Sequence, residues 1–165
     1  MAARVLPRSF YARPTVEVAR SLLGQRLEFR GRGGRIVEVE AYLPEGDEAA
    51  HAASGRTRRT EVLFGPPGRA YVFLAYGIHC CLNVVAEPEG IPGCVLIRAV
   101  EGCGDGPGKV TRALGITLEQ NGWDLIQSEL RILAAPAPRR ESVTVTPRIG
   151  IRRSAHLPLR FVLES

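Results

Sequence analysis

Lysine is nearly absent from this chain. Only Lys109 is a lysine, whereas 21 of the 22 basic residues are arginines. A mechanism that begins with attack by an amine therefore has only Lys109 and the N-terminal amine as candidates. The abundant arginines carry forked donors that suit phosphate groups. The net charge of +5 and the pI near 9.4 fit a polyanionic partner, but charge alone is equally compatible with a basic surface that binds none.

Long apolar runs are also lacking. None approaches the roughly 20 residues that a membrane-spanning helix needs, and the first residues, 1–7, lack the apolar core of a signal peptide. We therefore expect an intracellular protein, cytoplasmic or associated with a bacterial nucleoid, that does not contact a membrane. The length of 165 residues and a mean hydropathy of -0.01 predict one soluble domain over residues 1–165.

Cysteine is scarce, and its spacing argues against a metal site or a disulfide framework. The four cysteines, Cys80, Cys81, Cys94 and Cys103, contain no C-x-x-C pair. The adjacent pair would point to opposite sides of a strand. We therefore expect buried free thiols and no metal ion.

The pattern of apolar residues predicts a mixed α+β fold. An apolar stripe indicates a helix over residues 14–23, with Thr15 as its N-cap and Gly24 just after its end. A glycine-rich loop at 104–106 is expected to open a second short helix that reaches Leu114. Strand patterns occupy residues 25–30 and 35–41 around a turn at 31–34, 70–76 and 78–85 around Gly77, and then 94–100, 130–133, 147–151 and 159–163. We predict a single domain with a curved, mainly antiparallel, open-barrel-like sheet and a few peripheral helices.

The segment 35–42 carries the strongest indication of chemistry. In a strand, residues two apart share a face, so Glu38, Glu40 and Tyr42 would point to the same side. His51 follows Glu40 by 11 residues. A carboxylate, an aromatic ring and an imidazole can together hold a flat heterocycle and activate a water molecule beside it. Two polar residues inside later apolar strands, Asn83 and Arg98, must be paired or face a cleft, because burial without a partner is costly.

An ordered set of sequence blocks resembles one protein family. The blocks are Arg35-Ile-Val-Glu-Val-Glu-Ala-Tyr-Leu43, Asp47-Glu-Ala-Ala-His51, Gly68-Arg-Ala-Tyr-Val-Phe-Leu-Ala-Tyr-Gly-Ile-His79, Cys81-Leu-Asn-Val-Val85, Val95-Leu-Ile-Arg-Ala99, Gly106-Pro-Gly-Lys109, Arg148-Ile-Gly-Ile151 and Pro158-Leu-Arg-Phe161. In this order they resemble the alkyladenine (3-methyladenine) DNA glycosylases of the mammalian and bacterial type. The resemblance implies a single-domain mixed α/β fold and a role in base excision repair. It also implies that alkylated or deaminated purines, such as 3-methyladenine, 7-methylguanine and hypoxanthine, are flipped out of double-stranded DNA and removed by hydrolysis.

The resemblance implies two catalytic residues. Glu40 matches the general base that deprotonates the attacking water, and its charge can also stabilise the oxocarbenium-like sugar. Arg98 matches the residue that helps to place Glu40 and the water. Because Lys109 lies in a glycine-rich turn outside the pocket blocks, we expect a monofunctional enzyme that leaves an abasic site rather than one that forms a Schiff base.

The resemblance also assigns the walls of a base pocket. Tyr42 and His51 match residues that sandwich the flipped base, with a contact from His51 to the edge of the base. Phe73 stands where family members often carry tyrosine, so stacking is kept and a hydroxyl contact is lost. Asn83 matches a residue that disfavours the 2-amino group of normal guanine. Tyr76, near the tip of its predicted hairpin, matches the wedge that fills the gap left by the flipped base.

Further DNA contacts and one departure from the family pattern complete the prediction. Phosphate contacts are expected from Lys109 and from a basic loop with Arg56, Arg58 and Arg59, although that loop could equally be only solvated. After the segment Arg98-Ala-Val-Glu-Gly102 the family usually carries a further helical segment before the Gly-Pro-Gly-Lys block, but here residues 103–105 alone separate the two. We expect this shortening to affect DNA contacts and stability rather than the reaction.

Two other functions remain open from the residues. A DNA-binding module without activity would keep the basic face and Tyr76 but would not need Glu40 and Arg98. A metal-dependent hydrolase could use Glu40, Asp47, Glu48 and His51, but their spacing lacks a histidine pair at i, i+4. We expect no cofactor and a monomer that binds damaged double-stranded DNA.

Overall fold

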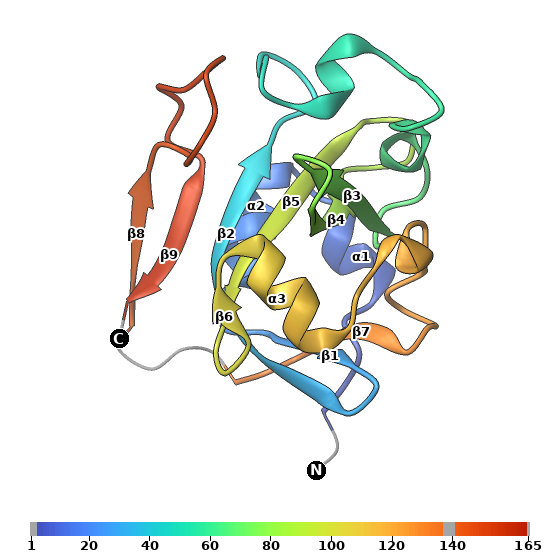
Figure 1. Cartoon of the computed structure of the whole chain (residues 1–165), viewed down its shortest axis with the longest axis vertical. Coiled ribbons are helices and arrows are strands. Elements are labelled where there is room, and N and C mark those ends of the chain that lie inside the picture. The colour runs from blue at the N-terminus through green and yellow to red at the C-terminus, as the bar shows by residue number, and fades with distance from the viewer. Residues whose placement is uncertain (1–2, 137–140, 165) are drawn as a thin grey trace.

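The chain folds around a strongly curved antiparallel sheet, as the computed structural model shows for residues 3–136 and 141–164 (Figure 1). Neighbouring strands follow the order β3-β4-β5-β2-β1-β7, and β6, β8 and β9 join beside this path. The strands are β1 (Arg26–Phe29), β2 (Arg32–Tyr42), β3 (Ala70–Ala75), β4 (His79–Ala86), β5 (Gly93–Val100), β6 (Gly104–Asp105), β7 (Leu130–Leu133), β8 (Ser142–Thr146) and β9 (Arg160–Glu164). The helices are α1 (Arg8–Tyr11), α2 (Thr15–Leu22) and α3 (Pro107–Leu114), with 3-10 turns η1 (His51–Ser54), η2 (Glu61–Phe64) and η3 (Leu118–Gln120). The predicted mixed fold with a curled, antiparallel, half-barrel sheet is confirmed.

Strand β2 connects the parts of this sheet. Its first residues pair with β1, and its second half pairs with both β5 and β9. The register between β2 and β5 shifts on both sides of Glu38, which marks an irregularity of the β-bulge type. Because a bulge bends its strand and increases the local twist, β2 can pair with β1 at one end and with β9 at the other.

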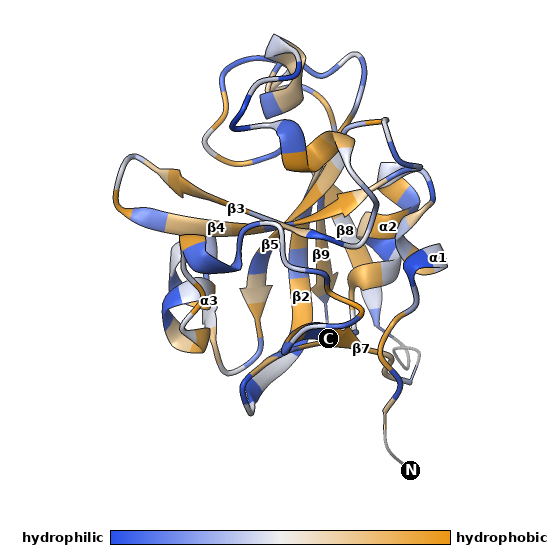
Figure 2. Cartoon of the chain, turned by 90° about the vertical axis from the view of Figure 1, so that its right-hand side faces the viewer, coloured by the Kyte–Doolittle hydropathy of each residue, from blue (hydrophilic) through white to orange (hydrophobic). Residues whose placement is uncertain are grey.

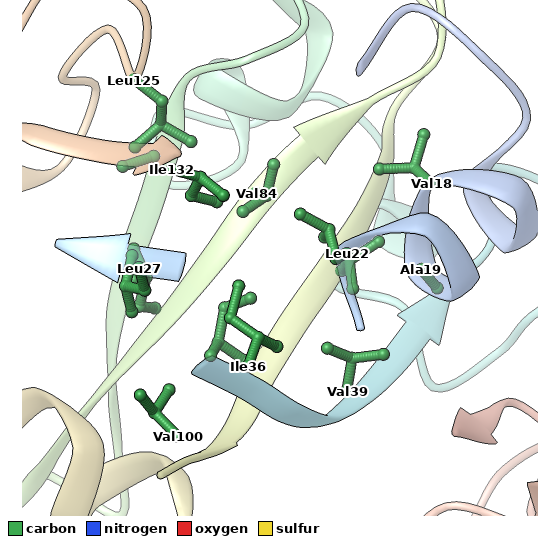
Figure 3. Packing of buried hydrophobic residues seen from close by; sticks show 14 of the residues in the cluster. Val18, Ala19, Leu22, Leu27, Ile36, Val39, Val84, Val100, Leu125 and Ile132 are labelled. Atoms are coloured by element: carbon green, nitrogen blue, oxygen red, sulfur yellow. The ribbon is translucent and has the colours of Figure 1, made fainter. Parts of the chain in front are cut away.

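Apolar side chains fill the space between the sheet and α2. The buried residues Val18, Ala19 and Leu22 of α2 lie beside Ile36 and Val39 of β2 (Figure 3). Figure 2 shows that the most hydrophobic segments are the strands themselves. Full burial of a side chain such as Leu22 contributes about 1.5–3 kcal/mol. The short helix is therefore stabilised mainly by its contact with the sheet rather than by its own propensity.

The helices differ from their predictions in three details. Thr15 does not cap α2: Pro14 is the N-cap residue, and the Thr15 hydroxyl donates instead to Oε2 of Glu87 at 2.7 Å. The helix ends at Leu22 rather than at residue 23. Helix α1 has no counterpart among the predicted elements, because its four residues are too few to show a helical repeat.

The first hairpin has a tighter turn than predicted. Arg30 and Gly31 alone form the turn, at φ values of 51° and 82°. Positive φ at both positions is the requirement of the two-residue turn that matches the twist of paired strands. Gly33 and Gly34, predicted in the turn, lie inside β2, where a Cβ atom would collide with backbone carbonyls of neighbouring segments.

The strand predicted over residues 147–151 is wrong. These residues form an irregular segment, and the strand of this region, β8, lies just before them and pairs with β9. Pro147 cannot donate a ladder hydrogen bond, which favours an end of the strand at this point. Four of the five residues of β8 are exposed, so its sequence lacks the apolar alternation by which a half-buried strand is found.

Two expectations from composition can be compared with the structure. All four cysteines are free, and Cys81 and Cys94 are buried, but Cys80 and Cys103 are only half-buried. Within residues 3–136 and 141–164, no helix combines the length and the apolar character needed to cross a bilayer.

Candidate active site

A pocket of about 490 Å³ opens beside the second half of β2. This volume is within the range of small-molecule sites. The pocket brings together residues from four strands, from the segments around His51 and 149–151, and from the start of α3. Its principal lining residues are Glu40, Tyr42, His51, Arg59, Tyr71, Phe73, Tyr76, Cys81, Asn83, Cys94, Leu96, Arg98, Pro107, Ile149 and Ile151. All the catalytic and base-pocket residues predicted from the sequence therefore meet at one site.

The carboxylate of Glu40 lies in the wall of this pocket and is held at both oxygens. The residue has no exposed surface. Its Oε1 accepts a hydrogen bond from the Tyr42 hydroxyl at 3.0 Å, and its Oε2 accepts one from the backbone N–H of Ile149 at 2.8 Å. Arg98 adds an ion pair, with Nη1 at 3.7 Å from Oε1. These partners offset the desolvation of a buried carboxylate, which would otherwise be prohibitive.

Arg98 is itself oriented by a second carboxylate. Its Nε donates to Oε2 of Glu38 at 3.0 Å, and Nε of Arg160 donates to the same oxygen at 2.9 Å. The guanidinium of Arg98 therefore bridges Glu38 and Glu40, two positions of β2 that lie on the same side of the strand. This geometry confirms the shared face expected for Glu38, Glu40 and Tyr42.

Tyr42 provides both a ring and a hydrogen-bond donor. Burial, followed by the nearby charge of Glu40, raises the pKa of its hydroxyl well above the usual range. The hydroxyl therefore stays protonated and continues to donate to Glu40. The guanidinium of Arg148 lies over the Tyr42 ring, 4.7 Å from its centroid, and Tyr42 also lines the pocket.

A second aromatic wall is formed by His51, Phe73 and Tyr71. The His51 ring centroid lies 4.4 Å from that of Phe73, and the His51 Nδ1 atom is 2.8 Å from the Tyr71 hydroxyl. Burial, with a smaller effect from the charge of Arg59, lowers the pKa of His51. The imidazole is thus neutral at neutral pH, and Tyr71 fixes its orientation.

The amide of Asn83 is buried and has partners on both sides. Its Nδ2 donates to the backbone oxygen of Tyr71 at 3.3 Å, and its Oδ1 lies 3.8 Å from the Cys94 thiol that donates to it. Burial raises the pKa of Cys94 to about 12, so this thiol stays protonated. Asn83 therefore presents a fixed amide to the pocket rather than a freely rotating one.

Tyr76 protrudes at the rim of the pocket. It lies at the tip of the hairpin of β3 and β4, at φ 54°, and is 87% exposed. Ile78, on the same tip, is 71% exposed. Figure 2 shows this hairpin projecting beyond the rest of the sheet. Exposed apolar side chains that lie together, rather than singly, often mark an interaction site.

Comparison with known proteins identifies the chain. The sequence model of the family described as "Methylpurine-DNA glycosylase (MPG)" matches residues 9–104 and 102–165. The chain belongs to the methylpurine-DNA glycosylase family. Across 96% of its length it is similar to proteins of Methanoculleus marisnigri (45% identical, 95% of that protein covered), Anaeromyxobacter dehalogenans (50%, 83%) and Bacillus thuringiensis (43%, 95%). Each of these relatives is named as a candidate 3-methyladenine DNA glycosylase.

Membership of this family makes the protein a DNA glycosylase, a DNA repair hydrolase that acts on N-glycosyl bonds and has DNA as its substrate. A DNA-binding module without activity is therefore not supported. The two matched blocks meet at residues 102–104, next to the place where the sequence predicts that the chain is shortened relative to the family. In this glycosylase β5 leads through a short turn to β6 and then directly to α3.

The basic residues predicted to contact phosphates have different environments in this glycosylase. Arg59 lines the pocket, with its guanidinium 5.5 Å from the centre of the Phe73 ring. Arg56 lies over the Phe64 ring at 5.4 Å and 3.8 Å from a carboxylate oxygen of Glu61. Lys109 is bound to Asp105 at 2.8 Å. The exposed Arg58 lines an adjacent groove along β3.

Two features of the pocket have no counterpart among the predicted site residues. Tyr71 orients His51, and the segment that begins at Arg148 places the Ile149 amide on Glu40. The block Arg148-Ile-Gly-Ile151 is one of the blocks that resemble the family, and this resemblance could have indicated that the segment belongs to the site. The segment was predicted as a strand instead, because an irregular segment has no periodic pattern by which it can be recognised.

The acidic residues near His51 do not form a metal site. Both oxygens of Asp47 accept hydrogen bonds from Arg148, at 2.6 Å and 2.8 Å. In the part of the chain that the structure describes, no group of three or more His, Cys, Asp or Glu side chains is placed to hold a metal ion. The donor arrangement therefore gives no support to a metal-dependent hydrolase built from Glu40, Asp47, Glu48 and His51.

Proposed function

We propose that this protein is a monofunctional glycosylase that removes alkylated or deaminated purines with a water molecule activated by Glu40. The substrates belong to the class of 3-methyladenine, 7-methylguanine and hypoxanthine in double-stranded DNA. The main support is the environment of Glu40: a fully buried carboxylate with donors on both oxygens, beside aromatic rings that can stack on a flat base. A carboxylate held in this way can face the sugar of a nucleotide that has rotated out of the duplex.

The proposed reaction is compatible with this geometry. As the N-glycosidic bond breaks, its electron pair leaves with the purine and positive charge builds on the sugar. The carboxylate of Glu40 stabilises that charge and accepts a proton from the water whose oxygen attacks C1′. An alkylated purine is already cationic and leaves as a neutral base, whereas hypoxanthine requires a proton to leave. The products are the free base and an abasic site.

The position of Lys109 supports a mechanism that uses water rather than an amine. Lys109 lies in the first turn of α3, is largely exposed and is paired with Asp105, and it does not line the pocket. A Schiff base to the sugar would need an amine within bonding distance of C1′. Incubation with damaged duplex and borohydride should therefore trap no covalent complex, and a trapped complex would show that the chemistry is different.

Base release from defined duplexes tests the proposal directly. Each duplex carries one lesion, and the wild type is compared with Glu40→Gln, which keeps the shape of the side chain and removes its charge. We expect a loss of about 10²–10⁴-fold in single-turnover rate, with binding of the lesion duplex retained in a mobility-shift assay. A near-normal rate for Glu40→Gln would show that another group activates the water.

A further inference from the structure

We propose that Asp47 and Arg148 are positioning residues of the glycosylase reaction. Their buried ion pair, called the Asp47–Arg148 clamp below, holds both hydrogen-bond donors of Glu40 in place. This inference rests on the role of Glu40 proposed above and extends it to two residues that do not touch the reacting atoms.

The clamp joins the end of β2 and the loop that follows it to a segment about 100 residues further along the chain. Both side chains are completely buried, and the guanidinium contacts the carboxylate through two parallel hydrogen bonds of 2.6 Å and 2.8 Å. Arg148 also donates to the backbone oxygens of Ala41 at 3.1 Å and of Ser154 at 3.3 Å. The end of β2, the loop that follows it and the segment after β8 are therefore fixed relative to one another.

Arg148 lies next to both donors of the Glu40 carboxylate. Ile149 is its neighbour in the chain and donates its N–H to Oε2 of Glu40 at 2.8 Å. Tyr42 lies under its guanidinium at 4.7 Å and donates its hydroxyl to Oε1 at 3.0 Å. A shift of Arg148 would thus disturb the hydrogen bonds at both oxygens of the catalytic carboxylate.

The segment around Ile149 has few other anchors. Within the described residues, no backbone-to-backbone hydrogen bond involves residues 147–151. Its polar contacts are those of the Arg148 side chain, of the Ile149 amide and of the Thr146 hydroxyl, which donates to the backbone oxygen of Pro147 at 3.0 Å. Without the clamp, the Ile149 amide would be free to leave Glu40.

Stability alone is a weak reason to retain such a pair. Burying two charges is costly, and apolar side chains of similar volume often give an equal or greater stability than a buried ion pair. The buried Nε of Arg148 has no partner among the described residues, which adds to this cost. A role in positioning the two hydrogen-bond donors of Glu40 gives a reason for a fully buried ion pair beside them.

The test compares the chemical step with substrate binding in four variants. Arg148→Lys keeps the positive charge but loses the guanidinium that makes two parallel hydrogen bonds to Asp47. Arg148→Met removes the positive charge. Asp47→Asn removes the negative charge with little change of shape. Ile132→Ala, in β7 and fully buried, is the control for loss of stability without contact to the pocket. Single-turnover rates, the dissociation constant for a lesion duplex and melting temperatures are measured for each variant.

We expect the rate of base release to fall about 10- to 100-fold in Arg148→Met and Asp47→Asn, because a displacement of about 1 Å in a catalytic group can cost 10²-fold. Arg148→Lys should retain more activity than Arg148→Met. Duplex binding should change less than about threefold, because the clamp does not contact DNA in this mechanism. Ile132→Ala should lower the melting temperature and leave the rate near that of the wild type.

Chemical rescue distinguishes a positioning role of Arg148 from a purely structural one. In Arg148→Ala, added guanidinium ion at non-denaturing concentration should restore part of the lost rate, whereas the same addition to Glu40→Gln should restore none. Wild-type rates in Arg148→Met or Asp47→Asn would overturn the inference. So would an equal loss of rate in Ile132→Ala at the same fall in melting temperature. If Arg148→Met does not fold, Arg148→Lys and Asp47→Asn decide the matter by the same criteria.

The outcomes also separate this inference from the proposed function. If Glu40→Gln is inactive and the clamp variants are fully active, only the clamp is wrong. If Glu40→Gln remains active, the proposed role of Glu40 fails, whatever the clamp variants do.

Discussion

Single side chains in this pocket carry more than one task, and Tyr42 is the clearest case. Its ring lies in the pocket wall, and its hydroxyl donates to the buried carboxylate of Glu40 at 3.0 Å. Alternation along a strand was enough to predict that the two residues share a face. The partner of the Tyr42 ring was not predictable, because Arg148 lies far along the chain and its ion pair with Asp47 spans 101 positions. Contacts of that kind leave no local pattern in a sequence.

Replacement of Tyr42 by phenylalanine separates its two tasks. The variant keeps the ring for stacking and loses the hydrogen bond to Oε1 of Glu40. We expect the rate of base release to fall about 10-fold, in keeping with the loss of about 1.5 kcal/mol for a hydrogen bond to a charged group. Binding of the lesion duplex should be preserved, as measured by fluorescence anisotropy. Equal losses of rate and binding would indicate that the hydroxyl serves the base rather than Glu40.

His51 should make stability depend on pH. Burial lowers its pKa in the folded state, so the unfolded chain binds this proton more tightly than the folded protein. The stability that neutral His51 contributes is therefore present above its unfolded pKa of about 6.5 and is lost as the pH falls through the folded pKa. Urea unfolding from about pH 7 to about pH 5 should show a smaller loss for His51→Gln than for the wild type. Equal losses in the two proteins would exclude His51 as the cause.

Among the elements, the hairpin of β3 and β4 was predicted with its tip in the right place. Gly77 marked the turn, and largely apolar runs on either side of it marked both strands. The same reasoning failed for β8, whose exposed residues resemble a loop in composition, and for 147–151, whose apolar residues serve the pocket rather than a ladder. Hydrophobic periodicity finds elements that bury one face, and these two segments do not.

The exposed tip of the hairpin leads to a prediction about base flipping. Tyr76→Ala should leave thermal stability unchanged, because the side chain is 87% exposed. Base release from duplex DNA should fall at least about 10-fold, since filling the gap in the stack offsets a cost of a few kcal/mol. Release from single-stranded DNA, where little stacking must be broken, should fall much less. Similar losses on both substrates would show that Tyr76 does not act as a wedge.

At the scale of the whole molecule, the arginine-rich composition fitted a polyanionic partner, but it did not show how individual arginines are engaged. All three arginines of the basic loop are exposed. Arg59 also lines the pocket, Arg56 is stacked on Phe64 and paired with Glu61, and Arg58 lies beside β3. The curved antiparallel sheet was predictable because turns and alternating strands follow one another along most of the chain. The bulge at Glu38, where the pairing of β2 with β5 shifts, was not predictable. A bulge depends on how a strand pairs and not on its own residues.

The salt dependence of DNA binding distinguishes these arginines. If Arg58 neutralises a phosphate, Arg58→Gln should reduce the slope of log affinity against log salt by about one. Arg56→Gln serves as the matched control from the same loop and should change the slope less, because its guanidinium is already engaged. Titrations between about 50 mM and 200 mM salt would measure both slopes. An unchanged slope for Arg58→Gln would remove this residue from the DNA interface.

The late position of Ile149 in the chain has a consequence for biosynthesis. The carboxylate of Glu40 emerges from the ribosome 109 residues before the amide that binds its Oε2. The strand β9 that pairs with β2 emerges later still. A nascent polypeptide would therefore display Tyr76 and the basic loop before both donors to the Glu40 carboxylate are in place. A polypeptide that stops before Ile149 would lack one of these two donors.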